Sequence, residues 1–485
     1  MEVSTKRNKI QEEGLESWIE RGGNSSLIIS QGVGKSFIMY KAFYRALTLG
    51  WITNTDPIFI FSFTKDQGSN LKKEASVFES VYGKNPLKDF NLEFWCYQSI
   101  PRHPRTFDVY DELDATLTPE YMRNLTQSPA RYKLGLTGTE SAGEYVFKDI
   151  AEQTGLVQSD ASTRMGKVTH LITKGQLIEI YLPVSYRYTR EQAVLDGIIA
   201  DMQTIIINHT LDDTHKRIWY RSRKKTKKEI VPKYTEKEWY AKKKGAIQYQ
   251  YTPTRAKQVI GQQMSRFLYN LPSKAVAAKK LLKLLPGKTI IFSERLALLN
   301  LITPNVVTSK ASSSFVVDNI FYNKKKVKKD GQDVFRYLKR HLLELKEKFI
   351  TQTEYDTVKS IWLTTRVESK ILFEKFNRGE ITEIASSKAI GRGMTLDNVD
   401  NGILLSYGSK HTPMSQKVAR TWRTDGKLKK TANLYVFRTI NTYEEAWFES
   451  MQYIYGTDKK LIGKMDLNIV REIPSLALSL PNFKL

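Results

Sequence analysis

The sequence predicts an α/β protein with parallel sheets flanked by helices, because short apolar segments alternate with amphipathic segments along the chain. An apolar strand at 26–29 is followed by a helix at 36–49 and by a second apolar strand at 57–63. The alternation returns near the middle of the chain, with a helix at 274–285 and a strand at 288–292. We therefore expect two α/β units separated by a less regular region.

The other elements follow from the same pattern. A helix is expected at 9–19, short strands at 92–96, 107–110 and 132–136, and a later strand at 403–407. The expected domains are a first domain at 1–185, a linker with a basic, partly helical insertion at 186–272, a second domain at 273–465 with a basic insertion near 312–355, and a C-terminal tail at 466–485.

Length and charge narrow the class of protein. The chain has 485 residues, too many for one core, and a formal net charge of +25. A positive field of this size attracts polyanions, so nucleic acid is the expected partner. A basic protein that is merely soluble, or that lies on anionic lipid, is the alternative.

The single cysteine and the absence of a long apolar run exclude proteins built on disulfides or multi-cysteine zinc sites and proteins that span a membrane. Cys96 alone cannot form an intramolecular disulfide or a multi-cysteine zinc site. No apolar run reaches the ~18 residues needed to cross a bilayer. We expect a cytoplasmic protein with no membrane association, present as a monomer or weak oligomer.

The turn after the first strand has a pattern typical of nucleotide phosphate binding. Glycines at 32 and 34 precede Lys35 and Ser36, so backbone N–H groups and the start of a helix would face phosphate oxygens. Lys35 would reach the β- and γ-phosphates of ATP, and the Ser36 hydroxyl would bind Mg²⁺. Ile29 stands where the full pattern has glycine, so a simple glycine turn before an exposed lysine is the alternative. The expected nucleotide-binding residues of this loop are Gln31, Gly32, Val33, Gly34, Lys35 and Ser36.

Acidic residues follow the strand at 107–110. Asp111 is expected to hold Mg²⁺, since hard cations prefer carboxylate oxygens. Glu112 is expected to orient and deprotonate the water that attacks the γ-phosphate. A solvated acidic loop is the alternative for Asp111, Glu112 and Asp114 taken alone.

These motifs resemble those of superfamily 2 helicases and translocases, which are motor ATPases with two RecA-like domains and an ATP cleft between them. Residues 31–36 resemble motif I, residues 111–114 motif II and residues 136–139 motif III of that superfamily. The resemblance implies that motif III couples hydrolysis to movement of the nucleic acid. The coupling residues are then Thr137, Gly138 and Thr139.

The same resemblance implies contacts with the nucleic-acid backbone. Residues 62–65 resemble motif Ia, residues 96–100 the Tyr-Gln-Ser element, and residues 385–396 motif V. Thr395 stands where many members have aspartate, so no acidic role is assigned there. The implied contacts come from Thr64, Lys65, Tyr97, Gln98, Ser99, Ser386, Ser387 and Arg392.

Residues 416–423 resemble motif VI, with Ala419 in place of the usual glycine. The resemblance implies that Gln416, Arg420 and Arg423 complete the ATP site from the second domain. Arg420 and Arg423 lie about one helical turn apart and would stabilise negative charge as arginine fingers. The alternative interpretation, from these residues alone, is two exposed arginines on a basic helix.

The branch of the superfamily is narrowed by residues 168–178, which resemble phage recombination helicases of the UvsW type and the type III restriction motors, most of which act on DNA. The aromatic lead-in of DEAD-box RNA helicases is absent near Gln11. Gln11 is expected either to contact adenine or to lie exposed on a helix.

Two basic segments lie outside these motifs. Lysines and arginines alternate with aromatic residues over 216–244, which suits phosphate contacts and base stacking, or a solvated excursion anchored by its rings. Lysines at 324–329 predict a positively charged appendage on the second domain.

The resemblance implies a nucleic-acid-stimulated ATPase that unwinds or branch-migrates single-stranded, forked or branched DNA in replication, recombination or repair, and that is encoded by a phage. The alternatives are a duplex translocase or remodelling subunit without strand separation, an RNA helicase, and a nucleic-acid-binding protein without enzymatic activity.

Overall fold

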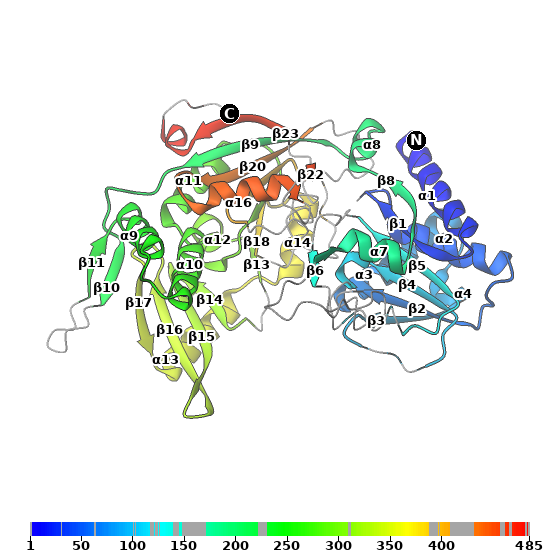
Figure 1. Ribbon diagram of the computed structural model, residues 1–485, viewed down its shortest axis with the longest axis horizontal. Coiled ribbons are helices and arrows are strands. Elements are labelled where there is room, and N and C mark those ends of the chain that lie inside the picture. The colour runs from blue at the N-terminus through cyan, green and yellow to red at the C-terminus, as the bar shows by residue number, and fades with distance from the viewer. Residues whose placement is uncertain are drawn as a thin grey trace.

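The computed structural model folds into two lobes, each built around a parallel sheet (Figure 1). The α/β fold with parallel sheets flanked by helices is therefore confirmed. The structure describes residues 2–30, 32–62, 65–99, 101, 103–116, 121, 125, 127–138, 145–147, 171–221, 230–308, 312–387, 396, 398–407, 431–455, 461–464, 468–480 and 483.

The first lobe contains a six-stranded sheet with the strand order β3-β2-β4-β5-β1-β8. All of its neighbouring strands pair in parallel, so the carboxyl ends of β1, β4 and β5 meet at one edge. The strands run over β1 (Asn24–Ile29), β2 (Pro57–Ser62), β3 (Asn91–Cys96), β4 (Phe107–Asp111), β5 (Tyr132–Thr137) and β8 (Val184–Tyr188).

Helices cover both faces of this sheet because its strands are apolar on both faces. Ile58, Ile60 and Val109 face α1, α2 and α3, while Phe59 and Phe61 pack with α7 on the other face. The helices of this lobe are α1 (Glu2–Glu20), α2 (Lys35–Thr48), α3 (Lys65–Tyr82), α4 (Pro86–Asp89) and α7 (Lys174–Tyr181).

The second lobe contains a seven-stranded parallel sheet with the order β13-β18-β12-β19-β20-β9-β23. Its strands are β9 (Asp201–His209), β12 (Thr289–Phe292), β13 (Val306–Val307), β18 (Glu383–Ser386), β19 (Asn401–Leu404), β20 (Thr431–Thr439) and β23 (Asn468–Pro474).

This sheet corrects two of the expected boundaries. The segment 186–272 is not only a linker and insertion, because β9 lies inside the second sheet between β20 and β23. The segment 466–485 is not only a tail, because β23 is the edge strand beside β9. The chain therefore enters the second sheet about 70 residues before the expected boundary at 273, as the start of β9 shows.

Helices also cover both faces of the second sheet. Ile291 and Tyr435 pack against α11 and α12, while Ile290 and Leu434 pack with α14 and α16. The remaining helices are α8 (Arg190–Leu195), which lies beside β8 and α1 (Figure 1), α9 (Glu236–Gln248), α10 (Thr254–Leu268), α11 (Pro272–Leu284), α12 (Leu296–Ile302), α13 (Gln352–Thr365), α14 (Ser369–Arg378) and α16 (Tyr443–Gln452).

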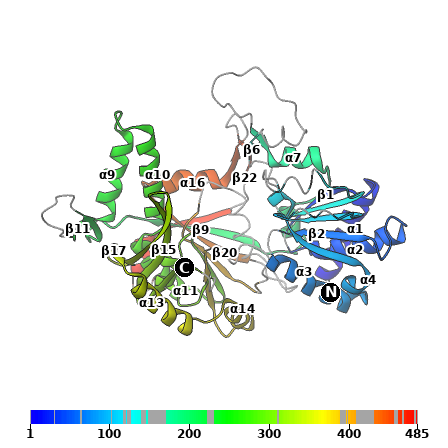
Figure 2. The ribbon, with the colours of Figure 1, turned by 90° about the horizontal axis from the view of Figure 1, so that it is seen from below.

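Two additions project from the second lobe. Helices α9 and α10 form a hairpin that stands out from it (Figure 2). A four-stranded antiparallel sheet is inserted in the chain between β13 and α13. The lysines at 324–329, expected in a positively charged appendage, fall in its second strand. Its strands are β14 (Ser314–Val317), β15 (Ile320–Lys329), β16 (Gln332–His341) and β17 (Lys346–Ile350).

Part of the basic, aromatic segment at 216–244 is anchored to the second lobe by a buried ring. The ring of Tyr240 is buried in the base of the hairpin, and its hydroxyl accepts a hydrogen bond from the backbone N–H of Tyr443 at 2.9 Å. The remaining short elements are η1 (Leu113–Thr116), β6 (Tyr145–Phe147), β7 (Leu171–Thr173), β10 (Ile218–Arg221), β11 (Ile230–Tyr234), β21 (Tyr453–Tyr455), β22 (Leu461–Lys464) and η2 (Ser475–Ser479).

Among the described residues, no helix is both long enough and apolar enough to span a membrane.

Candidate functional site

The glycine-rich turn lies at the carboxyl end of β1, directly before α2. Gly32 and Gly34 have φ values of 93° and 95°, in the left-handed region that favours glycine. Gly34 is the N-cap of α2 and supplies no side-chain cap, so the first N–H groups of the helix are left for another acceptor. This geometry fits an anion at the helix start.

Gln11 holds this turn from α1. Its Nε2 donates a hydrogen bond to the carbonyl oxygen of Val33 at 2.7 Å, and the side chain is only 4% exposed. The alternative of an exposed helix residue is therefore wrong. Its Oε1 is buried and has no hydrogen-bond partner among the described residues, so one acceptor beside the turn is left for a donor outside them.

The acidic motif faces the turn across the carboxyl edge of the sheet. Lys35 Nζ lies 3.4 Å from Glu112 Oε1, and the two side chains are 13% and 17% exposed. Glu112 has a φ of 56°, a strained backbone conformation for a residue with a side chain. The structure thus brings Lys35 and Glu112, 77 positions apart, into direct contact.

Asp111 ends β4 beside this ion pair. Burial, followed by the negative charge of Glu112, raises the pKa of Asp111 to about 7, against the opposing effect of Lys35. Neighbouring buried carboxylates repel each other, and a bound cation would relieve that repulsion. Asp111 therefore fits the expected role of a Mg²⁺ ligand, with Ser36 as its partner at the start of α2.

No group of three or more histidine, cysteine, aspartate or glutamate side chains suited to hold a metal occurs in the part of the chain that the structure describes. Asp111 and Ser36 remain the residues expected to hold Mg²⁺ beside this turn.

Tyr97 requires a correction. Its ring is 1% exposed and stacks on Phe61, so it does not face a nucleic acid. Its hydroxyl donates a hydrogen bond to the carbonyl oxygen of Asp111 at 2.5 Å. Tyr97 therefore positions the end of β4, a role that its motif resemblance did not indicate.

The segment expected to act in coupling contacts the acidic motif directly. The Thr137 hydroxyl donates to Asp114 Oδ1 at 3.0 Å, and both side chains are buried. Gly138 follows at the end of β5, and Thr139 lies outside the described residues.

The other residues expected to contact nucleic acid differ in how exposed their side chains are. Lys65, at the start of α3, and Gln98 are exposed, and Ser99 is half-buried. The Ser386 side chain is buried at the end of β18, so its expected surface contact is wrong, whereas Ser387 lines a cavity of the second lobe.

Several expected site residues lie outside the described residues, and these are Gln31, Thr64, Thr139, Arg392, Gln416, Arg420 and Arg423.

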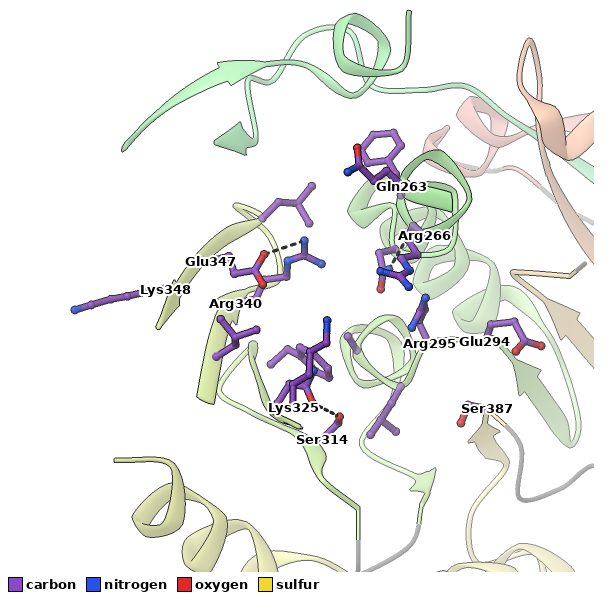
Figure 3. A pocket seen from close by; sticks show the side chains of 18 of the residues that line it. Gln263, Arg266, Glu294, Arg295, Ser314, Lys325, Arg340, Glu347, Lys348 and Ser387 are labelled. Carbon is purple, nitrogen blue, oxygen red and sulfur yellow. Dashed lines mark hydrogen bonds and ion pairs between the residues drawn. The ribbon is translucent and has the colours of Figure 1, made fainter. Parts of the chain in front are cut away.

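The sequence did not single out three arginines that meet in that cavity. Arg266, Arg295 and Arg340 come from α10, the N-cap of α12 and β16 (Figure 3). None of the three belongs to a motif, and the available signal was the basic insertion near 312–355, in which Arg340 follows Lys339.

One family model and several solved structures resemble this chain. Residues 314–425 match the family model described as "Helicase conserved C-terminal domain". No curated protein matches the chain.

Among solved structures, the ATP-dependent Type ISP restriction-modification enzyme LlaBIII bound to DNA has a TM-score of 0.47 at 12% identity, covering 96% of this chain and 31% of the enzyme. This chain thus spans about a third of that protein's length. Dbp5 of S. cerevisiae bound to RNA and ADP BeF3 has a TM-score of 0.47 at 9% identity, covering 96% of this chain and 90% of Dbp5. The L327V variant of Dbp5, also bound to RNA and ADP BeF3, has a TM-score of 0.46 at 9% identity, covering 97% of this chain and 90% of the variant.

The second half of this chain thus contains a region, residues 314–425, similar to the conserved C-terminal domain of helicases.

Proposed function

We propose that this chain is an ATP-dependent helicase or translocase of superfamily 2 that acts on nucleic acid and hydrolyses ATP to ADP and phosphate. The observation that carries this proposal is the Lys35–Glu112 pair at 3.4 Å, next to Asp111 and the glycine turn. The match of residues 314–425 to a helicase domain supports it from the other half of the chain.

The residues of the first lobe have complementary roles toward ATP. Backbone N–H groups of the turn would bind phosphate oxygens, and Lys35 would bind the β- and γ-phosphates. Ser36 and Asp111 would hold Mg²⁺, which when bound neutralises phosphate charge. Gln11, which holds the turn through Val33, has a buried acceptor that the adenine amine would satisfy.

Glu112 has the role of the general base. In the structure its carboxylate is paired with Lys35, so phosphates that attract the lysine would release Glu112 toward the attacking water. The pair is then a resting contact that ATP binding replaces.

We further propose that Gln416, Arg420 and Arg423 complete the site from the second domain. Arginine side chains at the γ-phosphate stabilise charge in the transition state and contribute ~10³–10⁵ in rate in other phosphoryl-transfer enzymes.

The nucleic acid is proposed to be DNA in single-stranded, forked or branched form. The protein is proposed to act in replication, recombination or repair and to be encoded by a phage. The formal charge of +25 supports a polyanion partner, and the likeness of residues 168–178 to recombination helicases supports DNA over RNA.

The experiment that tests this function measures ATP hydrolysis with single-stranded DNA, duplex, forked DNA, a four-way junction and RNA. We expect hydrolysis to rise with at least one DNA, and Lys35→Ala or Glu112→Gln to abolish the rise. Lys9→Ala, which removes a surface lysine of α1, serves as the control and keeps it. Intact nucleic-acid-stimulated hydrolysis in Lys35→Ala would contradict the proposal.

Unwinding and duplex translocation are separated by a second pair of assays on the wild-type protein. Strand displacement from a fork reports unwinding, whereas triplex displacement from a duplex reports translocation alone. We expect both activities, and triplex displacement without strand displacement would assign a duplex translocase.

A further inference from the structure

A cavity of about 1310 Å³ opens in the second lobe between its two additions. One wall is the α9–α10 hairpin, with Trp239, Arg266 and Phe267, and the opposite wall is the antiparallel sheet of β15, β16 and β17 (Figure 3). Arg295 and Ser387 line it from the parallel-sheet body. The cavity is therefore bounded mainly by elements added to the α/β fold.

The two faces of the antiparallel sheet differ in what they contact. Tyr322 and Tyr337 point to the face that packs on α13. Phe321 and Lys325 on β15, and Arg340 on β16, point to the opposite face and line the cavity. The register pairs Phe321 with Arg340, so these side chains are neighbours across the strands. The strand alternation thus directs one set of side chains into the cavity.

Three guanidinium groups converge in the cavity from separate elements. Burial and then the positive charge of Arg266 lower the pKa of Arg295, with a further contribution from Arg340. The Nε atoms of Arg295 and Arg340 are buried without a hydrogen-bond partner in the described part of the chain. Like charges held together with unsatisfied donors favour a bound anion.

Charges around the cavity are not balanced within it. Four cationic side chains face it against two carboxylates, Glu294 and Glu347. The nearest atoms of Arg340 and Glu347 are 3.7 Å apart, a loose contact that leaves most of the guanidinium's hydrogen-bonding capacity unused. These cationic residues are Arg266, Arg295, Lys325 and Arg340, whereas the side chain of Lys348 points away from the cavity (Figure 3).

Aromatic rings accompany these charges. Trp239 and Phe267 lie on the hairpin wall with ring centroids 4.3 Å apart. Phe349 lies on the sheet wall, and 52% of this apolar residue is exposed to solvent. A basic groove with accessible rings is the combination that binds unpaired nucleotides, since the rings stack on bases that a duplex would keep paired.

We propose that the α9–α10 hairpin and the β14–β17 sheet clamp a single strand of nucleic acid, with its phosphates on Arg266, Arg295, Arg340 and Lys325 and a base on Phe349. This proposal rests on the proposed function, which it extends by naming the form of nucleic acid and an accessory site that grips it. The position of Ser387 in the cavity joins the clamp to the body of the second lobe.

The charge test measures binding of a fluorescent 20-nucleotide oligothymidylate by anisotropy, without nucleotide. The double variant Lys325→Gln/Arg340→Gln is expected to bind at least tenfold more weakly. It should also lower the magnitude of the slope of log K against log salt by about 1.4, because each of the two lost phosphate contacts contributes about 0.7. Lys326→Gln is the control, because Lys326 is adjacent on β15 but pairs with Asp333 on the other face. Equal affinities of the double variant and the control would overturn the clamp.

The stacking test compares two exposed phenylalanines on opposite faces of the same sheet. Phe349→Ala is expected to weaken oligothymidylate binding about fivefold or more, and to leave binding of an abasic strand of the same length unchanged. Phe335→Ala is the control, since Phe335 is 47% exposed and lies beneath Lys324 on the face away from the cavity. An equal loss in both variants, or an equal loss for the abasic strand, would overturn the stacking role.

A 20-base-pair duplex tests the single-strand assignment. The double variant is expected to lose less affinity for the duplex than for the single strand, and an equal or larger loss on the duplex would overturn the assignment. Because binding is measured without ATP, this result is independent of hydrolysis. A failure of the clamp and a failure of the proposed ATPase therefore give different outcomes.

Discussion

The Thr137 hydroxyl donates a hydrogen bond to Asp114 Oδ1 at 3.0 Å, linking the end of β5 to the helical turn η1. Both side chains are buried, so water does not compete for this contact. Asp114 lies two residues after Glu112, which pairs with Lys35. A shift at the end of β5 therefore has a direct mechanical route to the proposed catalytic carboxylate.

The first prediction concerns this link. Thr137→Val removes the donor while keeping the shape, and we expect strand displacement to fall more than tenfold while ATP hydrolysis changes by only a few fold. The buried Asp114 loses a partner, which costs about 1–3 kcal/mol of unfolding free energy. Parallel ATPase and displacement assays check the result, with Thr137→Ser as the control that keeps the hydroxyl. Equal losses in the two assays would show that the contact is structural only.

A second prediction concerns Gly34. A side chain at this position is strained at a φ of 95°, and its Cβ would lie 2.9 Å from Gln11 Nε2. We expect Gly34→Ala to displace Gln11 from Val33 and to weaken binding of a fluorescent ATP analogue at least tenfold. Gly50→Ala is the matched control, because Gly50 also has a positive φ but would meet nothing within 4 Å. That variant should lose about 1–2 kcal/mol of stability and keep its nucleotide affinity. A similar affinity in both variants would argue against the role of the turn.

Local pattern predicted much of the first lobe. The apolar strands β1, β4 and β5 and the turn before Lys35 depend on near neighbours in sequence, and the structure has them where they were expected. Their mutual order in a parallel sheet then brings the Lys35 turn and Asp111 to one edge. The contact between Lys35 and Glu112 follows from that topology.

Long-range pairing explains what the sequence did not predict. Strand β9 was not predicted, since its partner β20 begins more than 200 residues later, at Thr431, and no local signal specifies that pairing. Similarly, Tyr97 carries a motif resemblance while its burial depends on Phe61 and Asp111 from other strands. The three arginines of the cavity meet because an antiparallel register folds Arg340 back toward Arg295.

A third prediction follows from His209, which is buried at the end of β9. Its Nε2 lies 3.0 Å from Ser273 Oγ and its Nδ1 lies 3.2 Å from Ser475 Oγ. Burial, followed by the positive charge of Lys274, lowers the pKa of His209 to about 3, while Asp212 opposes the shift. Folded His209 therefore stays neutral across a range in which the unfolded histidine takes up a proton.

The sign follows from proton binding. Between pH 6.5 and about 3 the unfolded state binds more protons at His209, so stability falls as pH falls. At pH 5 the loss from this group is on the order of 2 kcal/mol relative to pH 8. Glu236, which accepts a hydrogen bond from Ser273, has a pKa raised by burial and acts in the opposite direction. Urea unfolding at both pH values should show a smaller pH effect in His209→Gln than in the wild type, and an unchanged effect would assign the pH dependence to other groups.

The last prediction concerns the buried pair of Lys274 and Glu444. Lys274 Nζ lies 2.7 Å from Glu444 Oε1, the side chains are 0% and 1% exposed, and the lysine also donates to the Leu405 carbonyl oxygen. Removing one partner leaves an uncompensated buried charge, so Lys274→Met or Glu444→Leu should each lower the unfolding free energy by about 3–5 kcal/mol. The double variant Lys274→Met/Glu444→Leu should be less destabilised than the sum of the two, because neither charge remains.

An exposed pair provides the comparison. Lys237 and Asp213 are 3.3 Å apart on the surface, and Asp213→Asn should cost less than about 1 kcal/mol because solvent screens both charges. Urea unfolding of the five proteins gives the coupling energy of the buried pair directly. Additive losses at Lys274 and Glu444 would show that the two side chains stabilise α11 and α16 through packing alone. A double variant more stable than either single variant would show that the cost of the single changes is that of burying one unpaired charge.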